Sequence, residues 1–314
     1  MNYIKKIPLP IAAVMLALAA LGNLLSTYGI VYKNICGVLS ALVLILLTVK
    51  IITCWKDVKN EMKNPVIAGV MPTYSMGIML LAGYLKDISF TSGLVLWWVG
   101  VIIHLVLIIL YTKNFIIGFD IKKMFPSTFI VYVGIGIAGI TAPAFKLIVL
   151  GQGFFWFAFI SLIVLIPLLG YRTFVVKGIP EPALPTNVIF AAPAALTLAA
   201  YLNSFSEKNI YMISFLSILV ILLYICGLIF LVKGLKLKFY PSYAAFTFPM
   251  VISAIAMKGT NAFLIKIDKG ISIIKYVVKF QEIVAIIIVV YVLVRFLMFI
   301  FTCETVKVEN SISQ

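Results

Sequence analysis

Side chains that could move protons, hold a metal ion or attack a substrate are scarce in this sequence. Histidine occurs once in 314 residues, as His104, so a histidine-based metal site is not indicated. The four cysteines include no C-x-x-C pair, which indicates neither a disulfide framework nor a zinc site; they are Cys36, Cys54, Cys226 and Cys303. Paired carboxylates, a Cys/His arrangement and a phosphate-binding glycine loop are also missing. The sequence therefore predicts a protein that is not an enzyme and uses no metal ion or cofactor.

Three ionisable residues stand inside long apolar stretches and could titrate or bind a substrate: His104, Glu282 and Arg295. A lone buried histidine either packs through hydrogen bonds or carries a proton. Glu282 and Arg295 would lie about 20 Å apart along one helix, at 1.5 Å per residue, so they cannot pair with each other.

One aromatic residue stands in a position where it could close a path. In the stretch FYPSYAAFTFPM, Pro241 opens an uncharged segment, Pro249 follows eight residues later, and Phe248 precedes the second proline. A bulky ring beside a bend can act as a hydrophobic constriction, closing a path by steric block or by dewetting. The alternative is that Phe248 is one more packing aromatic among 23 phenylalanines.

The elements that carry these residues are membrane spans. Apolar residues make up 64% of the chain and charged residues 11%, whereas soluble domains are about 45–50% apolar and about one quarter charged. The spans must be helices, because the alternating pattern of a barrel strand does not occur. We read a single transmembrane domain over residues 1–314 with ten helices: 8–27, 35–55, 66–84, 91–112, 127–145, 148–170, 185–203, 209–232, 241–257 and 277–302. The first could also be a cleaved signal peptide, but its prolines fit the repeat described below.

The distribution of lysine and arginine predicts the orientation. Most of the 25 basic residues lie at the two ends and in the loops after the second, fourth, sixth and eighth spans. The positive-inside rule then places both termini in the cytoplasm, and we expect the protein to lie in the cell (plasma) membrane. The net charge of +15 is spread over loops on two sides, with no long basic arm, which argues against a nucleic-acid partner.

The opposite face has one concentration of positive charge, in the connection before the last span. This outer basic cluster could raise the local concentration of anions near a pore mouth, or it could contact lipid headgroups. Its members are Lys258, Lys266, Lys269, Lys275 and Lys279.

Prolines reveal an internal repeat of helical hairpins. The first, third, fifth, seventh and ninth spans each begin at a proline, with spacings of 57, 61, 59 and 56 residues: Pro8, Pro65, Pro126, Pro185 and Pro241. A second proline follows in three repeats as Pro72, Pro193 and Pro249, and Gly134 takes its place in a fourth.

Odd-numbered and even-numbered spans differ in kind. The odd ones hold nearly all the prolines, several glycines and small polar residues, whereas the even ones are mostly Leu, Ile, Val and Phe. An interior proline bends a helix and frees a carbonyl that must find protein or water. We therefore expect an inner ring of five bent helices lining a central pore, inside an outer ring of five straight ones. Ordinary packing also enriches Gly and Pro in membrane helices, but it would not sort them by parity. The predicted lining residues, besides Phe248 as pore gate, are Pro72, Thr73, Thr128, Gly134, Thr186, Asn187, Pro193, Phe246, Thr247 and Pro249.

The predicted inner spans contain no Asp, Glu, Lys, Arg or His. A cation would find no buried carboxylate there, whereas hydroxyls, helix N-termini and basic loops would attract an anion weakly. The favoured function is passive passage of small inorganic or organic anions. The alternative is a coupled carrier that uses His104, Glu282 or Arg295. Because these three fall on even spans, we expect Glu282 and Arg295 to meet lipid headgroups or a neighbouring subunit.

Three segments carry a family resemblance: FPSTF from Phe125, LPT…APA from Leu184, and most specifically SYAAFTFPM from Ser242. The chain resembles the tellurite-resistance/dicarboxylate transporter family, which includes the slow anion channels of plant guard cells and belongs to the voltage-dependent anion channel superfamily. The resemblance covers nearly the whole chain. It implies a homotrimer in membrane lipid, with five hairpins in pseudo-fivefold arrangement around a pore in each subunit and a gating phenylalanine at Phe248.

The resemblance also implies the kind of cargo. The channels of this family pass chloride and nitrate, and its carriers move malate-like C4-dicarboxylates or sulfite. The carrier alternative for this chain is such a transporter coupled to protons. Some bacterial members are linked to tellurite resistance. Tellurite efflux is therefore included in the carrier alternative.

Overall fold

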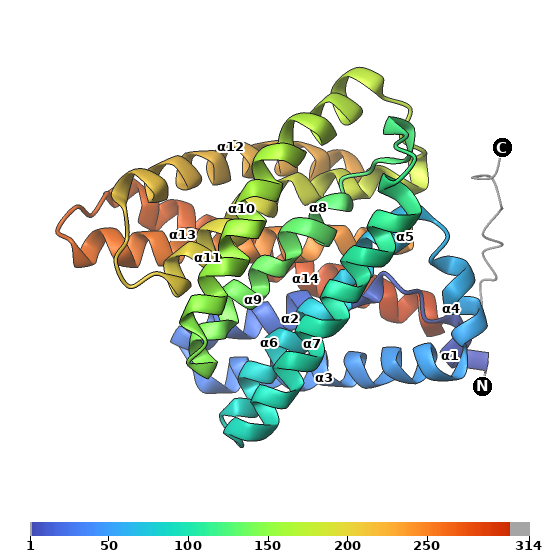
Figure 1. Ribbon diagram of the computed structural model, residues 1–314, viewed down its shortest axis with the longest axis horizontal. Helices are drawn as coiled ribbons and strands as arrows, with labels where there is room; N and C mark the ends of the chain where they lie inside the picture. The colour runs from blue at the N-terminus through green and yellow to red at the C-terminus, as the bar shows by residue number, and fades with distance from the viewer. Residues whose placement is uncertain (1, 302–314) are drawn as a thin grey trace.

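The fold, given by a computed structural model, is described for residues 2–301. All regular structure in this range is helical, and no strand occurs in it. The predicted last span reaches residue 302, so its final residue lies outside the described range, as does Cys303. Ten of the described helical stretches are long and apolar enough to cross a membrane. The prediction of an all-α membrane protein with ten such helices is confirmed (Figure 1).

The even-numbered spans are long, regular helices. They are α3 (Ile30–Thr53), α7 (Phe90–Tyr111), α10 (Ile148–Gly170), α12 (Ile210–Gly234) and α14 (Ser272–Phe301). One turn of π-helix extends α7 over Thr112–Ile116 and α10 over Tyr171–Val176. Two short helices, α1 (Asn2–Lys6) and α4 (Trp55–Glu61), lie outside the spans.

The odd-numbered spans are less regular, and all but the first are divided into two or more helical segments. The first is α2 (Ile11–Leu25), and the third is α5 (Pro65–Val70) followed by α6 (Pro72–Lys86). The fifth joins α8 (Thr128–Tyr132) to α9 (Gly136–Thr141) through a 3-10 turn at Val133–Ile135. The seventh and ninth begin as 3-10 segments, η7 (Glu181–Ala191) and η8 (Pro241–Phe246), and continue as α11 (Pro193–Ser204) and α13 (Thr247–Lys266).

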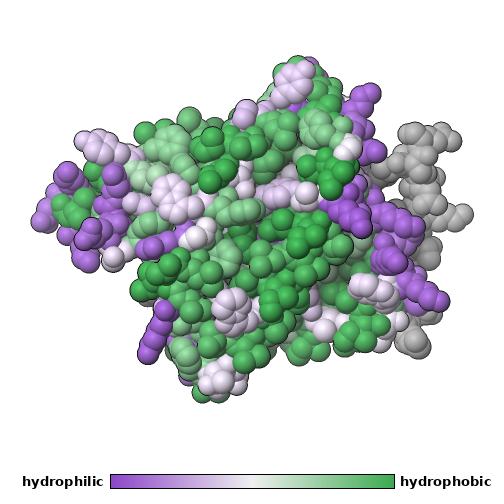
Figure 2. Space-filling model, in the orientation of Figure 1, coloured by the Kyte–Doolittle hydropathy of each residue, from purple (hydrophilic) through white to green (hydrophobic). Residues whose placement is uncertain are grey.

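Burial separates the two sets of spans. In an 18-residue stretch of each odd span 61–94% of the residues are buried, against 22–28% in the even spans. The odd spans therefore form the inside of the molecule and the even spans its outside. Figure 2 shows the result on one face: hydrophobic side chains form the middle, and hydrophilic ones gather towards the two ends. Such a surface is unfavourable in water and favourable against lipid.

The ninth span is longer than its sequence predicts. We expected it to end at residue 257, but α13 continues to Lys266. The extra turns are stabilised by packing, because Thr260 and Leu264 are buried and the Thr260 hydroxyl donates to the Ala256 carbonyl at 3.0 Å. The connection to α14 is therefore only residues 267–271.

Glycine permits the close approach of α6 and α7 in the second hairpin. A Cβ placed on Gly93 would lie 2.8 Å from both the Cα and the N of Lys86, and 2.9 Å from the carbonyl oxygen of Ala82. These are backbone atoms, which cannot move aside without separating the helices. Gly93 belongs to α7. A Cβ placed on Gly83 of α6, by contrast, would lie in open space, with nothing within 4 Å.

We expect Gly93→Ala to destabilise the protein by about 1–3 kcal/mol, as overpacking does in well-packed cores. The matched control Gly83→Ala should be neutral or stabilising, because alanine favours a helix over glycine by about 1 kcal/mol. Thermal unfolding of the two purified variants in the same detergent measures the difference. Equal melting temperatures would show that this helix crossing relaxes easily.

Candidate functional site

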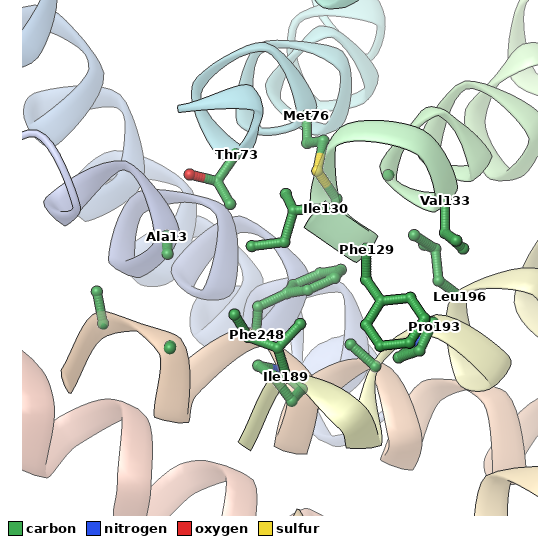
Figure 3. A pocket seen from close by; sticks show the side chains of 15 residues that line it. Ala13, Thr73, Met76, Phe129, Ile130, Val133, Ile189, Pro193, Leu196 and Phe248 are labelled. Carbon is green, nitrogen blue, oxygen red and sulfur yellow. The ribbon is translucent and has the colours of Figure 1, made fainter. Parts of the chain in front are cut away.

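A small cavity lies at the centre of the inner ring. Its volume is about 30 Å³, room for about two water molecules. All five odd spans contribute to its wall, and its lining is apolar except for Thr73 (Figure 3). The lining residues are Ala13, Thr73, Met76, Phe129, Ile130, Val133, Gly134, Ile189, Ala192, Pro193, Leu196, Ala244, Ala245, Phe248 and Pro249.

The lining follows the proline repeat. Counted from the proline that opens each of the last four odd spans, every lining residue stands 3, 4, 7, 8 or 11 positions later. Phe129, for example, is three residues after Pro126, and Phe248 is seven after Pro241. Steps of three and four residues select one face of a helix. Each of these four repeats therefore presents the same face to the cavity.

Phe248 and its neighbours face different ways. The Phe248 side chain points into the cavity, is 5% exposed, and is followed in the wall by Pro249 (Figure 3). The Phe246 ring lies 4.7 Å from the Tyr243 ring, and a Cβ on Gly234 of α12 would lie 2.6 Å from the Phe246 ring. Phe246 is therefore directed outward, where it packs against α12.

The eleven residues predicted for the lining and gate divide into two groups. The five that line the cavity are Thr73, Gly134, Pro193, Phe248 and Pro249. The six that do not are Pro72, Thr128, Thr186, Asn187, Phe246 and Thr247. Asn187 instead lines a separate pocket at one end of the molecule.

Hydroxyl groups of the inner spans are directed towards the protein backbone. Thr73 donates to the Val70 carbonyl at 2.7 Å, Thr186 to Ala183 at 2.6 Å, and Thr247 to Ala244 at 2.7 Å. The Thr128 hydroxyl lies 2.8 Å from the Tyr111 hydroxyl. We expected such hydroxyls to meet a passing anion, but the protons of Thr73, Thr186 and Thr247 are already used. The prolines at positions 193 and 249 have no N–H to offer, so the cavity wall has few hydrogen-bond donors.

Phe129 is a lining residue that the sequence interpretation did not select. Its ring points into the cavity near that of Phe248 (Figure 3) and lies 5.4 Å from the ring of Phe190. The signal was present, because Phe129 has the same offset from Pro126 that Ala244 has from Pro241. Extending the repeat from prolines to the residues between them would have identified it.

His104 is buried directly behind the cavity wall. A Cβ on Gly134 would lie 3.1 Å from the His104 ring, and the histidine is fully buried although α7 is an outer helix. Its Nδ1 lies 2.9 Å from the Ser75 hydroxyl, and its Nε2 lies 3.2 Å from the Val131 carbonyl oxygen. The Ser75 hydroxyl also lies 2.8 Å from the Pro72 carbonyl oxygen.

The number of available protons limits which of these three contacts can form together. Both carbonyls can only accept, and Ser75 has one proton to donate. A neutral His104 ring carries one N–H and so satisfies two of the three contacts. The third forms only when both ring nitrogens are protonated. The state of His104 is thereby linked to the Pro72 carbonyl, which lies at the break between α5 and α6.

Glu282 is part of a buried cluster at the end of the bundle where α2 ends, formed by the first, ninth and tenth spans. It is 3% exposed, accepts from Lys258 Nζ at 2.8 Å and accepts from the Tyr28 hydroxyl at 2.6 Å. The expectation that Glu282 meets headgroups or another subunit is therefore wrong, because its partners lie within its own chain. Arg295 is half-buried, donating to the Tyr291 hydroxyl at 2.9 Å and stacking 5.2 Å from the Phe239 ring.

The outer basic cluster is divided by these contacts. Lys258 is held by Glu282, and Lys279 lies 4.9 Å from the centroid of the Tyr28 ring. The other three members, Lys266, Lys269 and Lys275, are exposed. Burial, together with the positive charge of Lys266, lowers the pKa of the nearby Lys208 amine. Positive charge at this end therefore remains available to solvent.

No group of three or more His, Cys, Asp or Glu residues that could hold a metal ion occurs in the described part of the chain. No curated protein matches the chain significantly. A family model described as "voltage-dependent anion channel" matches residues 6–302, which is nearly the whole sequence. With ten apolar helices in two rings and this match, the chain belongs to the voltage-dependent anion channel family.

Proposed function

We propose that each subunit passes small anions along the axis of its five inner spans, and that Phe248 is the gate. The observation that carries this proposal is the central cavity, because residues of all five inner spans line it and the Phe248 ring projects into it. Family membership supports an anion channel or transporter in general.

The geometry corresponds to a closed path. A cavity of about 30 Å³ is too small to let a hydrated ion through, and an apolar constriction resists wetting. Phe248 and Phe129 are the two aromatic side chains in the wall. Opening then requires their rings to turn or the two spans to separate.

Selectivity for anions would come from the ends of the path more than from its middle. The cavity wall has no ionisable side chain and few free donors, so it binds an ion of either sign weakly. Basic residues at both ends of the bundle, within a net charge of +15, raise the local concentration of anions. Weak binding in the middle favours conduction, because an ion must leave as readily as it enters.

The membrane location and orientation that we propose are those predicted from the sequence. The protein would lie in the plasma membrane with both termini in the cytoplasm, as the positive-inside rule requires. The exposed apolar side chains of the outer spans would contact membrane lipids and, in a homotrimer, neighbouring subunits.

A second candidate function is proton-coupled transport of malate-like dicarboxylates or sulfite, or tellurite efflux. The observation that favours it is His104, whose protonation state is linked to the backbone at the break in the third span. Glu282 contributes less to this alternative, because its contacts with Lys258 and Tyr28 hold it near the outer end.

We expect Phe248→Ala to raise anion current by about tenfold or more, which corresponds to removing about 1.4 kcal/mol from the barrier. The measurement is current across a planar bilayer containing the purified protein, with chloride, nitrate and malate compared under a salt gradient. Phe263→Ala is the matched control, since Phe263 lies on the same helix and does not line the cavity. Equal currents in the wild type and a folded Phe248→Ala protein would rule out Phe248 as the gate.

Replacing Lys266, Lys269 and Lys275 by glutamine in one variant should lower anion current more at low salt than at high salt. At 1 M salt the Debye length is about 3 Å, so the effect should nearly disappear. Replacing the same three lysines with arginine keeps the charge and should leave the current unchanged. A loss that is independent of salt would point to structural damage.

A passive channel predicts that a pH gradient does not shift the reversal potential, in the wild type or in His104→Gln. If instead anion uptake into vesicles follows the pH gradient and His104→Gln abolishes this response, the protein is the coupled carrier. Uptake driven by an anion gradient alone, measured on the same vesicles, checks that the variant still transports.

A further inference from the structure

A second pocket, of about 370 Å³, is lined by residues of outer and inner spans. It lies where the outer spans α10 and α12 end and the inner segment η7 begins. This is the end of the bundle where α2 begins, because the spans alternate in direction. Its volume falls in the range of small-ligand pockets, about 300–1,000 Å³.

The pocket carries positive charge that is not neutralised. Lys177 and Lys233 both line it, and no acidic residue does. Neither lysine takes part in any of the four ion pairs found between described residues. Both are exposed, so their ammonium groups are free to bind a ligand.

A buried arginine fixes one wall of the pocket. Arg172 is 2% exposed, and its guanidinium donates to the carbonyl of Lys177 and, at 3.3 Å, to that of Lys122. Lys177 adopts a φ of +57°, which an L-residue rarely adopts without support. The contact turns the Lys177 carbonyl, a hydrogen-bond acceptor, towards Arg172. It also places a third positive charge behind the wall, partly offset by the nearby Asp120 carboxylate.

Polar groups in the wall have no protein partner. Asn187 is 4% exposed and its Oδ1 forms no hydrogen bond, nor does Oγ1 of Thr173. Buried polar atoms are nearly always paired, so such atoms in a pocket point to a ligand or water. Rotating the Asn187 amide by 180° exchanges its oxygen and nitrogen and would present an NH₂ donor.

Another part of the wall is aromatic. Phe174 and Phe230 both line the pocket, and their rings stack with centroids 5.9 Å apart at an angle of 28°. Phe174 is 53% exposed on the side of the molecule that would face lipid. The pocket thus combines positive charge and unpaired polar groups with an apolar wall open to the membrane.

We propose that this pocket binds a phosphoryl group, supplied by the headgroup of an anionic lipid in the leaflet that surrounds it. Lysine binds phosphate as a point charge, and basic residues near an anionic membrane surface attract such lipids. The aromatic wall accommodates the start of the acyl chains. Asn187 belongs to η7, the segment that also carries the cavity residue Ile189, so an occupied pocket contacts a span of the inner ring.

Native mass spectrometry of the full chain can test this by counting the phosphatidylglycerol and phosphatidylcholine molecules that stay bound. Wild type should retain phosphatidylglycerol preferentially, and Lys177→Gln with Lys233→Gln should weaken its binding by about 30-fold. Lys59→Gln with Lys236→Gln is the matched control, removing two exposed lysines from the same end outside the pocket. The double arginine variant at 177 and 233 should bind like wild type.

A second arm identifies the source of the phosphoryl group. In nanodiscs of phosphatidylcholine alone, inorganic phosphate should raise the melting temperature of wild type more than that of the pocket variant if the site takes a soluble ion. If inorganic phosphate has no such effect and phosphatidylglycerol added to the nanodiscs does, the site takes a lipid headgroup. The proposal is overturned if neither ligand distinguishes wild type from the pocket variant, or if the control pair loses binding equally.

Discussion

A backbone carbonyl that loses its hydrogen-bond donor inside a membrane must find another, and this constraint shapes the inner ring. The prolines that bend the inner spans have no N–H to donate, and the hydroxyls of these spans are directed to backbone carbonyls beside the breaks. The Ser253 hydroxyl, for example, lies 2.8 Å from the Pro249 carbonyl oxygen and 3.1 Å from the Ala191 carbonyl oxygen, and its one proton is shared between them. Small polar residues in these spans therefore serve the backbone. The cavity that they surround is left apolar, which is why an aromatic ring suffices to close it.

The arrangement of the spans could be predicted from the sequence because proline spacing and polarity both alternate with span number. Two independent patterns gave the same division into ten helices, and burial reproduces that division. The direction of individual side chains could not be predicted in this way. Thr73 and Thr128 look alike in the sequence, yet only Thr73 lines the cavity, because Thr128 is rotated towards Tyr111 of the neighbouring helix.

The odd or even number of a span also did not predict the surroundings of its charged and titratable residues. An outer helix still has one inward stripe, and in α7 this stripe runs through Gly93, Trp97, Gly100 and His104 at helical spacing. His104 therefore faces the inner ring although its helix does not belong to it. Glu282 shows the same limit over a longer range, since its partner Tyr28 is 254 residues away. No local pattern reveals such a partner.

Contacts of this length join the two ends of the chain. Thr247 bonds to the Ala13 carbonyl, Lys258 to that of Leu24, and Tyr28 to Glu282, across 234 to 254 residues. During synthesis the first hairpin is made long before these partners exist. It must wait in the bilayer with polar groups unmatched, or matched by lipid and water, until the last hairpin arrives. The contacts that close the ring of inner spans therefore form late in assembly. Substitutions in the last hairpin that remove them would leave the first hairpin without its partners.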